Sequence, residues 1–211
     1  MAIDTETRGT RRRERTRNAL LSATRELIAE GGVDGVRTGE ITERADVAAG
    51  SFYNHFADKQ EIVEAVLTEV SEEQGKVVDL MTAELEDPAE VVACAHRHFV
   101  DLAAADPSFA QLVVKLNASH QLLMGTLGPR AVRDVQRGID EGRFRAEDVS
   151  LAVYATGGAL IGTMQGVLDG TLGPNASELN AASVLRMLGI PYDEAAEISR
   201  RPLPSPSDRA A

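Results

Sequence analysis

The stretch that decides the fold is residues 38–59, which reads TGEITERADVAAGSFYNHFADK. Within it Ile41 and Ala45 stand four positions apart, and so do Phe52 and Phe56, so each pair lies on one face of a short helix. The residues between the pairs predict a tight turn. Two short helices joined in this way hold the second one out from a small domain, where it fits a DNA major groove.

The second helix leaves an outward face of small or hydrogen-bonding side chains. Small residues suit close approach to a groove, and Tyr53, Asn54 and His55 are placed to reach phosphates or base edges. The alternative is a helical hairpin with ordinary aromatic anchors and no DNA contact. The predicted DNA-contacting residues are Arg37, Thr38, Ala48, Ala49, Gly50, Ser51, Tyr53, Asn54, His55 and Lys59.

Basic residues stand at both ends of this module. Asp58 and Glu61 form a predicted capping box, which places Lys59 beside a helix N-terminus, a favourable position for a phosphate. A run of arginines precedes the module, and such a run can lie along phosphates or in an adjacent minor groove, as an N-terminal arm does. The other interpretation of the run is a solvated leader. The arginines are Arg8, Arg11, Arg12, Arg13, Arg15 and Arg17.

The module resembles the TetR family of transcriptional repressors. The family pattern has a Thr before its second helix, a recognition helix that ends in Tyr-x-His-Phe, and a Lys three residues later. The resemblance covers residues 11–70 and rests on Thr38, Ile41, Ala45, Val47, Tyr53, His55, Phe56 and Lys59.

Two departures from the family pattern affect the turn and the recognition helix. Asp46 stands where the turn usually has Gly, and Asp tolerates the left-handed conformation that such a turn needs. Ala48 and Ala49 stand where a capping Ser or Thr and a polar or basic reader are common. Alanine offers a base only a contact to the thymine methyl group.

The resemblance implies an all-α protein, with an N-terminal three-helix helix-turn-helix DNA-binding domain and a larger C-terminal helical bundle for ligand binding and dimerisation. On this basis we expect a flexible leader at 1–10 and the DNA-binding domain at 11–58. The effector-binding and dimerisation domain is expected at 59–198, with a disordered tail at 199–211.

The charge of the chain is divided unevenly. The 211 residues carry a formal net charge of -11, yet residues 1–60 hold ten basic and ten acidic residues, so the acidic excess lies beyond them. A single Cys and the polar, Arg-rich start without a hydrophobic signal region indicate a reducing cytoplasmic location. The neutral N-terminal part is therefore compatible with DNA despite the acidic total.

Helices are predicted along the whole chain and no strand is expected. The first has inward residues Leu20, Ala23, Leu27 and Ile28 and ends at Gly31 and Gly32. A linking helix follows Lys59. Two Asp-Pro pairs then mark fresh helix starts, because Asp caps and Pro suits the first helical position. The helices expected next are 88–104, 108–124 and 129–140, then one near 147–170 and a last amphipathic one that ends at Gly189.

The helix near 147–170 lacks charged residues between Asp148 and Asp169, and carries glycine at every fourth position from Gly158. It is long enough to cross a bilayer but rather polar for that. A ridge of glycines suits close packing, and the family resemblance implies that the last two long helices pair with their copies in a homodimer. The alternative is a central helix of a monomeric bundle. The predicted interface residues are Gly158, Gly162, Gly166 and Leu185.

The middle helices are the expected place of an effector pocket, again by resemblance. The acidic, Trp-free composition favours an apolar or cationic ligand over a flat stacked or anionic one. Each proposed lining residue is equally compatible with an ordinary core. The proposed residues are Phe99, Phe109, Leu112, Leu116, His120, Met124 and Tyr154.

No catalytic motif or cofactor site is recognisable. Cys94 and His98 share one helical face with His96 nearby, but two ligands without a third do not make a metal site. Two functions are therefore compared. The first is a TetR-like repressor, released from a palindromic operator by a small-molecule effector. The second is an architectural DNA-binding protein that uses phosphate contacts and needs no effector.

Overall fold

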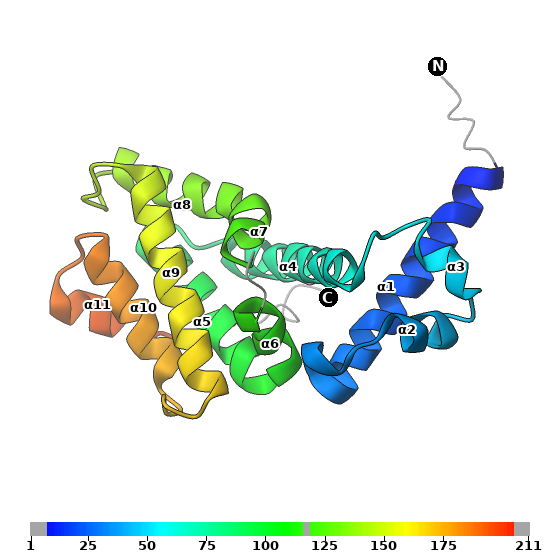
Figure 1. Ribbon diagram of the computed structural model, residues 1–211. Helices are drawn as coiled ribbons and strands as arrows, with labels where there is room; N and C mark the ends of the chain where they lie inside the picture. Colours follow the sequence, from blue (N-terminus) through cyan, green and yellow to red (C-terminus); the bar gives the residue numbers. More distant parts are fainter. Residues whose placement is uncertain (1–7, 116–118, 205–211) are drawn as a thin grey trace, which may run out of the picture. The chain divides into compact units, whose positions relative to one another are not determined.

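The computed structural model describes residues 8–115 and 119–204, and every regular element in this part of the chain is an α-helix (Figure 1). The predicted all-α class is confirmed. The chain divides into two compact units, residues 1–66 and 67–211. The fourth helix, α4 (Lys59–Thr82), begins in the first unit and continues into the second. The division between the two compact units therefore falls within α4, whereas the domain boundary predicted from the sequence lies at the start of this helix.

The first unit consists of α1 (Arg8–Gly35), α2 (Thr38–Arg44), α3 (Ala49–Phe52) and the first turns of α4. The predicted helix end at Gly31 and Gly32 is visible as a break inside α1, where Gly32 has a φ of 71°. Asp46, between α2 and α3, has a φ of 50°, the left-handed conformation expected of it. The core of the unit is apolar and contains Leu20, Ile28, Ile41, Phe52, Phe56 and Ile62.

The start of α1 corrects the expectation of an N-terminal arm. The helix begins at Arg8, so the arginine run lies on a helix rather than on an extended segment. Residues 10–17 consist of Thr, Arg and Glu, which include strong helix formers and no Gly or Pro, so the helix continues through them. Residues 1–7 of the predicted leader lie outside the described part of the chain.

The second unit is built around α5 (Pro88–Ala105), which packs against both α9 (Val149–Leu168) and α10 (Ala176–Met187) (Figure 1). The other helices are α6 (Pro107–Lys115), α7 (Ser119–Thr126), α8 (Gly128–Asp140) and α11 (Tyr192–Ile198). An apolar cluster joins α5, α8, α9, α10 and α11, and includes Val92, Val135, Phe144, Val153, Leu185 and Leu188.

Aspartate caps fix the helix starts of this unit. Asp87 Oδ1 accepts a hydrogen bond from the Ala89 amide at 2.9 Å, and Asp106 Oδ1 accepts one from the Ser108 amide at 3.0 Å. Both predicted Asp-Pro starts are confirmed. Asp148 caps α9 in the same way, and each such cap contributes about 1 kcal/mol.

The helix predicted over 108–124 is described as α6 and α7, on either side of residues 116–118, which lie outside the described part of the chain. Two expectations for this unit are corrected. Helix α11 follows Pro191 and was not expected. The tail predicted from residue 199 is held at Arg201, whose guanidinium bonds to Glu90 and to Glu197. Residues 205–211 lie outside the described part.

Helix α9 is long and apolar enough to cross a membrane by length and composition alone, with a mean hydropathy of 1.3. One such helix is weak support for a membrane protein, and α9 packs against α5, α8 and α10. Only 17% of its apolar window is buried within the chain. Helix α9 therefore has one face in the core and another that the chain leaves uncovered.

The packing of α8 gives a test of the fold. A Cβ at Gly138 would lie 2.1 Å from the Phe144 ring, whereas a Cβ at Gly125 in α7 would meet nothing within 4 Å. Gly138→Ala is therefore expected to lower the free energy of unfolding by about 1–3 kcal/mol through overpacking. Gly125→Ala should leave it unchanged or raise it by up to about 1 kcal/mol, since Ala is the better helix former. Urea denaturation of both variants measures this, and equal stabilities would contradict the packing.

Candidate functional site

The surface formed by α2, α3 and the following turn presents the predicted DNA-contacting residues. Phe52 and Phe56 are buried beneath it, which fixes the helix, while Tyr53 is 66% exposed. The α-helical part of this segment is short, and backbone hydrogen bonds from Asn54 and His55 continue the turn beyond Phe52. Also exposed are Arg37, Ala48, Ala49, Gly50 and Asn54, whereas Thr38, Ser51, His55 and Lys59 are half-buried.

A bidentate ion pair holds α2 against α1. Arg44 Nη1 and Nη2 donate to the two carboxylate oxygens of Glu30 at 2.7 and 2.9 Å, and Nη1 also lies 3.4 Å from Glu26. The fork geometry of guanidinium against carboxylate restricts the angle between the two helices. This pair therefore helps to set the orientation of α3 relative to α1.

The start of α4 has the predicted capping box. The Glu61 amide donates to Asp58 Oδ1 at 2.9 Å, and the Glu61 carboxylate accepts from the Ala57 amide. Lys59 Nζ lies at this helix end but donates to the Asp34 carbonyl at 3.2 Å. A phosphate contact by Lys59 would therefore replace or share an existing hydrogen bond.

The arginine run divides into two groups on α1. Arg13 Nη2 donates to the Asn54 carbonyl at 3.4 Å, and the Arg17 guanidinium lies 5.3 Å from the centre of the Phe56 ring. Burial, together with the positive charges of Arg13 and Arg17, lowers the pKa of His55. The other group lines a surface groove beside the α2–α3 turn, with the residues Arg11, Arg12, Arg15, Ala45, Asp46 and Val47.

The second unit contains a partly open cavity of about 110 Å³ between α4, α5, α7, α8 and α9. Its walls are mainly apolar, with polar groups contributed by several helices. Helix α4 supplies Gly75, Val78 and Asp79, and α5 supplies Val92, Ala95, His96 and Phe99. The remaining lining residues are His120, Leu123, Met124, Leu127, Gly128, Arg130, Ala131, Asp134, Val135, Val153, Thr156, Gly157, Leu160 and Ile161.

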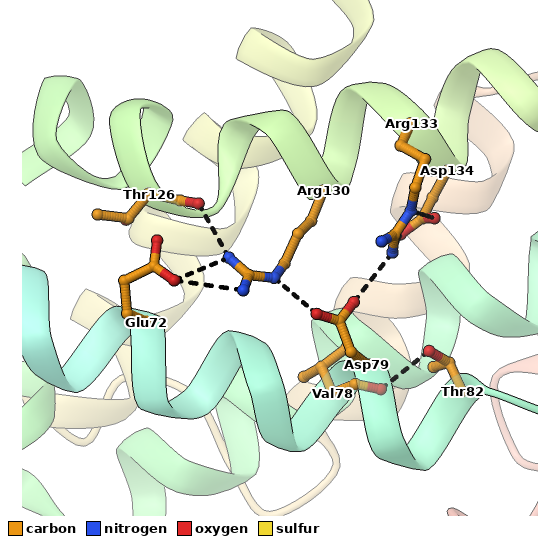
Figure 2. Close-up of polar contacts among 8 residues, drawn as sticks. All are labelled: Glu72, Val78, Asp79, Thr82, Thr126, Arg130, Arg133 and Asp134. Atoms are coloured by element: carbon orange, nitrogen blue, oxygen red, sulfur yellow. Dashed lines mark hydrogen bonds and ion pairs between the residues drawn. The ribbon is translucent and has the colours of Figure 1, made fainter. Parts of the chain in front are cut away.

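Arg130 forms the polar part of the cavity wall and joins α8 to α4 (Figure 2). Its Nε donates to Asp79 Oδ2 at 2.8 Å, and its Nη1 and Nη2 each donate to Glu72 Oε2 at 3.2 Å. Gly75 makes room for this side chain, because a Cβ there would lie 3.0 Å from Arg130 Cζ. The guanidinium therefore lies across α4 between two carboxylates.

The network continues along α8. Arg133 Nη2 donates to Asp79 Oδ1 at 3.0 Å, and Arg133 Nε donates to Asp134 Oδ1 at 2.8 Å (Figure 2). Burial alone would raise the pKa of Asp79, but the hydrogen bonds from Arg130 and Arg133 outweigh it and the pKa is lowered. Asp79 is therefore ionised at neutral pH.

A second polar group reaches the cavity from α5. His96 Nδ1 lies 3.0 Å from Asn180 Oδ1 of α10, and burial lowers the pKa of His96 to about 4. His96 is half-buried and is one of the residues that line the cavity. The imidazole is therefore neutral at pH 7.

Three of the residues proposed from sequence, Phe99, His120 and Met124, line the cavity. Phe109 and Leu112 are core residues outside it, and Tyr154 is exposed with its ring 5.0 Å from that of His120. Leu116 lies outside the described residues. The apolar pattern of the sequence does not distinguish residues that line the cavity from residues of the core. The charged residues of α4 and α8 that line the cavity are not predicted from the sequence either, because an amphipathic helix normally carries such residues on its solvent face.

The predicted interface is partly corrected as well. Gly158 and Gly162 are exposed, and a Cβ at either would meet nothing within 4 Å. Gly166 is covered within the chain, since its Cβ would lie 2.7 Å from the Leu172 side chain. Leu185 is fully buried in the core, because its side of α10 packs against α5. The uncovered apolar side chains near the two glycines are Leu151, Tyr154, Leu172 and Leu179.

The residues considered for metal binding have other surroundings. Cys94 is buried, and burial raises the pKa of its thiol to about 11. His98 Nε2 lies 2.9 Å from Gln74 Oε1. Among the residues that the structure describes, no three His, Cys, Asp or Glu side chains lie together in a way that could hold a metal ion.

Comparisons with known families agree with this division into two parts. Residues 20–66 match the model of the bacterial regulatory proteins of the tetR family, and residues 87–201 match a tetracyclin repressor-like C-terminal domain. An uncharacterized HTH-type transcriptional regulator of Bacillus subtilis (strain 168), YvkB, is 30% identical over 70 residues, and the match spans 37% of its length.

Solved structures extend the similarity over nearly the whole chain. The crystal structure of RolR in complex with its ligand resorcinol is 40% identical, with a TM-score of 0.87, over 92% of this chain and 98% of that one. RolR without ligand has a TM-score of 0.83 at 40% identity, over 90% and 99% of the two chains. FadR from Bacillus subtilis in complex with stearoyl-CoA, 21% identical over 82% and 97%, has the same fold with a TM-score of 0.64.

The charged part of the cavity wall gives a second prediction. Arg130→Met leaves Glu72 without this partner and Asp79 with Arg133 alone, so the free energy of unfolding should fall by about 1–3 kcal/mol. The control is Arg137→Met on the same helix, whose exposed contacts to Glu141 and to the Glu86 carbonyl together should contribute less than about 1 kcal/mol. Thermal and urea unfolding measure both, and equal effects would mean that the Arg130 network does not stabilise the unit.

Proposed function

The chain belongs to the TetR family of bacterial transcriptional regulators, and we propose that it is a homodimeric repressor, released from a palindromic operator by a small hydroxylated effector. The observation that carries this proposal is the cavity with a charged wall at Arg130 and Asp79. A bundle that served only as a scaffold would gain more from apolar packing at this place than from partly buried ion pairs.

The size and chemistry of the cavity favour one small ring as the effector. A cavity of about 150 Å³ with apolar walls holds one benzene ring, and this one measures about 110 Å³. Polar groups in the wall favour a ring with hydrogen-bonding substituents. This proposal differs from the sequence expectation, which favoured an apolar or cationic ligand over a flat stacked one. The ligand in the RolR complex, resorcinol, is a single ring with two hydroxyl groups, which supports the same class of effector here.

Helix α4 is the proposed link between effector and DNA. It starts at Lys59 beside the DNA-contacting surface and supplies Gly75, Val78 and Asp79 to the cavity. An effector changes DNA affinity only to the extent that it binds one conformation better than the other. Contacts to Asp79 and Arg130 provide such a difference if the pair is arranged differently in the DNA-bound form.

Recognition of DNA is proposed to use α3 and the turn after it. In a dimer, two such surfaces about 34–36 Å apart would reach successive major grooves of a palindrome. Arg11, Arg12 and Arg15 are proposed to contact phosphates, which adds affinity without sequence preference. Small residues at Ala48, Ala49 and Gly50 leave Tyr53 and Asn54 as the main side chains for base edges or phosphates.

The repressor proposal is tested by DNA binding of the full chain at physiological salt. One site in the DNA that flanks its own gene should bind at least about a thousandfold more tightly than random DNA. Resorcinol, used as the probe, should weaken that binding by about 5–150-fold. Fluorescence anisotropy with footprinting measures both. Equal affinity for all sequences with no response to the probe would favour the architectural alternative.

The proposed dimer uses the uncovered face of α9 with α10. Leu179 is 61% exposed on α10, and a surface hollow beside Gly162 is lined by residues of both helices. An apolar face with two open glycines lets the same helix of a second copy approach closely. A two-fold axis would place each glycine against its copy or a near neighbour.

Gly162→Leu tests this interface. A bulky side chain in a tight symmetric contact typically costs about 1–3 kcal/mol at each of the two copies, so the variant should sediment as a monomer at dilute concentration. Operator affinity should fall with it, because a monomer contacts half a palindrome. Gly125→Leu, on the open side of α7, is the control and should stay dimeric. A Gly162→Leu protein that remains dimeric would place the interface elsewhere.

A further inference from the structure

Asn180 is held in one orientation by its neighbours on α9. Its Nδ2 donates to the Ala159 carbonyl at 3.2 Å and to Thr163 Oγ1 at 2.8 Å. A carbonyl oxygen only accepts, so the amide nitrogen must face α9 and the amide oxygen must face away from it. Asn180 Oδ1 therefore is the atom that lies 3.0 Å from His96 Nδ1.

This contact determines the tautomer of His96. Because Asn180 Oδ1 carries no proton, Nδ1 of the imidazole must donate one. The low pKa of His96 keeps a second proton off the ring at neutral pH. Nε2 is therefore left with a free lone pair and acts only as an acceptor.

The remaining acceptor belongs to a cavity-lining residue. His96 lines the cavity, and Nε2 has no hydrogen-bond partner among the residues described. Two other polar lining groups are already engaged: Arg130 with Asp79, and Thr156 Oγ1 with the Ala152 carbonyl at 2.9 Å. An acceptor of a cavity-lining residue that has no protein partner is available to a ligand, so a ligand that donates to it gains affinity.

We propose that His96 Nε2 accepts a hydrogen bond from the effector, and that Asn180 is the positioning residue that holds the imidazole in the accepting tautomer. This inference rests on the proposed function of the cavity as the effector site. It adds a specificity determinant on α5, separate from the charged network of α4 and α8.

The accepting role of His96 Nε2 restricts the chemical class of the effector. A neutral hydroxyl or N–H group satisfies Nε2, whereas an ether, a halide or a carboxylate offers it no proton. His120, the other imidazole of the lining, packs against the Tyr154 ring, and no hydrogen bond in the described part of the chain fixes its tautomer. His96 is therefore the imidazole with a defined role as acceptor.

A matched pair of probes tests the proposal. Resorcinol and 1,3-difluorobenzene have similar shapes, but only the first donates hydrogen bonds. Isothermal titration calorimetry on the full chain should show tighter binding of resorcinol to the wild type. In His96→Leu this advantage should shrink by about tenfold, and His96→Gln should recover part of it through the amide oxygen. His98→Leu is the control, since His98 bonds to Gln74 outside the cavity and the advantage should persist.

The tautomer of the His96 imidazole can be measured directly. Nitrogen NMR of the labelled chain should show His96 protonated at Nδ1 and bare at Nε2, with the Nε2 resonance moved by resorcinol. Asn180→Leu should give a mixture of tautomers, and a purely structural role of Asn180 would leave the tautomer unchanged. A wild-type ring protonated at Nε2 overturns the proposal without any variant, so an unstable His96→Leu does not affect the result.

The outcomes separate this inference from the function on which it rests. If both probes bind and resorcinol still binds more tightly than 1,3-difluorobenzene in His96→Leu, the role of His96 is overturned and the cavity remains a ligand site. Binding of neither probe would overturn both. Loss of the resorcinol advantage in His98→Leu as well as in His96→Leu would show a general effect of α5 packing and would also overturn the assignment.

Discussion

The ion pairs of Arg130 are the interaction on which the second unit depends most. A guanidinium that is largely removed from water needs carboxylate partners, and here Asp79 and Glu72 supply them from α4. Because the guanidinium fork accepts few geometries, this contact limits how α8 can lie against α4. The absence of a side chain at Gly75 completes the arrangement, since any Cβ there would press on the guanidinium. These charged groups join the two helices at one wall of the cavity.

The same network makes the cavity sensitive to what enters it. In the proposed function, a donor or acceptor on a ligand would compete for Asp79 or Arg130, and a change in their pairing would act on α4 because Glu72 and Asp79 belong to that helix. Interactions inside a cavity are less screened than at a surface, so a single ligand hydroxyl there has a larger effect than the same group in water. The neutral His96 adds selection by hydrogen bonding without adding charge. Affinity and response can therefore depend on different residues of one small site.

Local patterns in the sequence predicted the elements of the fold, and tertiary contacts decided the site. Asp87 and Asp106 mark helix starts through bonds to amides two residues away, so their roles can be predicted from a short window. Arg130 and Asp79 are 51 positions apart, and each stands on an amphipathic helix where a charged residue normally faces solvent. Leu185 illustrates the opposite error: its apolar spacing fits a partner helix and the chain's own core equally well, and only the packing of α10 against α5 distinguishes them.

Helix α9 connects the two proposed activities of the second unit. Val153, Thr156, Gly157 and Leu160 lie on the face that lines the cavity, at helical spacing, whereas Leu151, Tyr154, Gly158 and Gly162 lie on the exposed face. A ligand in the cavity and a partner copy on the exposed face would therefore act on one helix from opposite sides. Asn180 lies at the same place, because its amide donates to Ala159 and Thr163 of α9 while its oxygen holds His96. An element that contacts two sites can couple them. In the proposed function, α9 and Asn180 would couple effector binding to the geometry of the dimer, and α4 would couple effector binding to DNA binding.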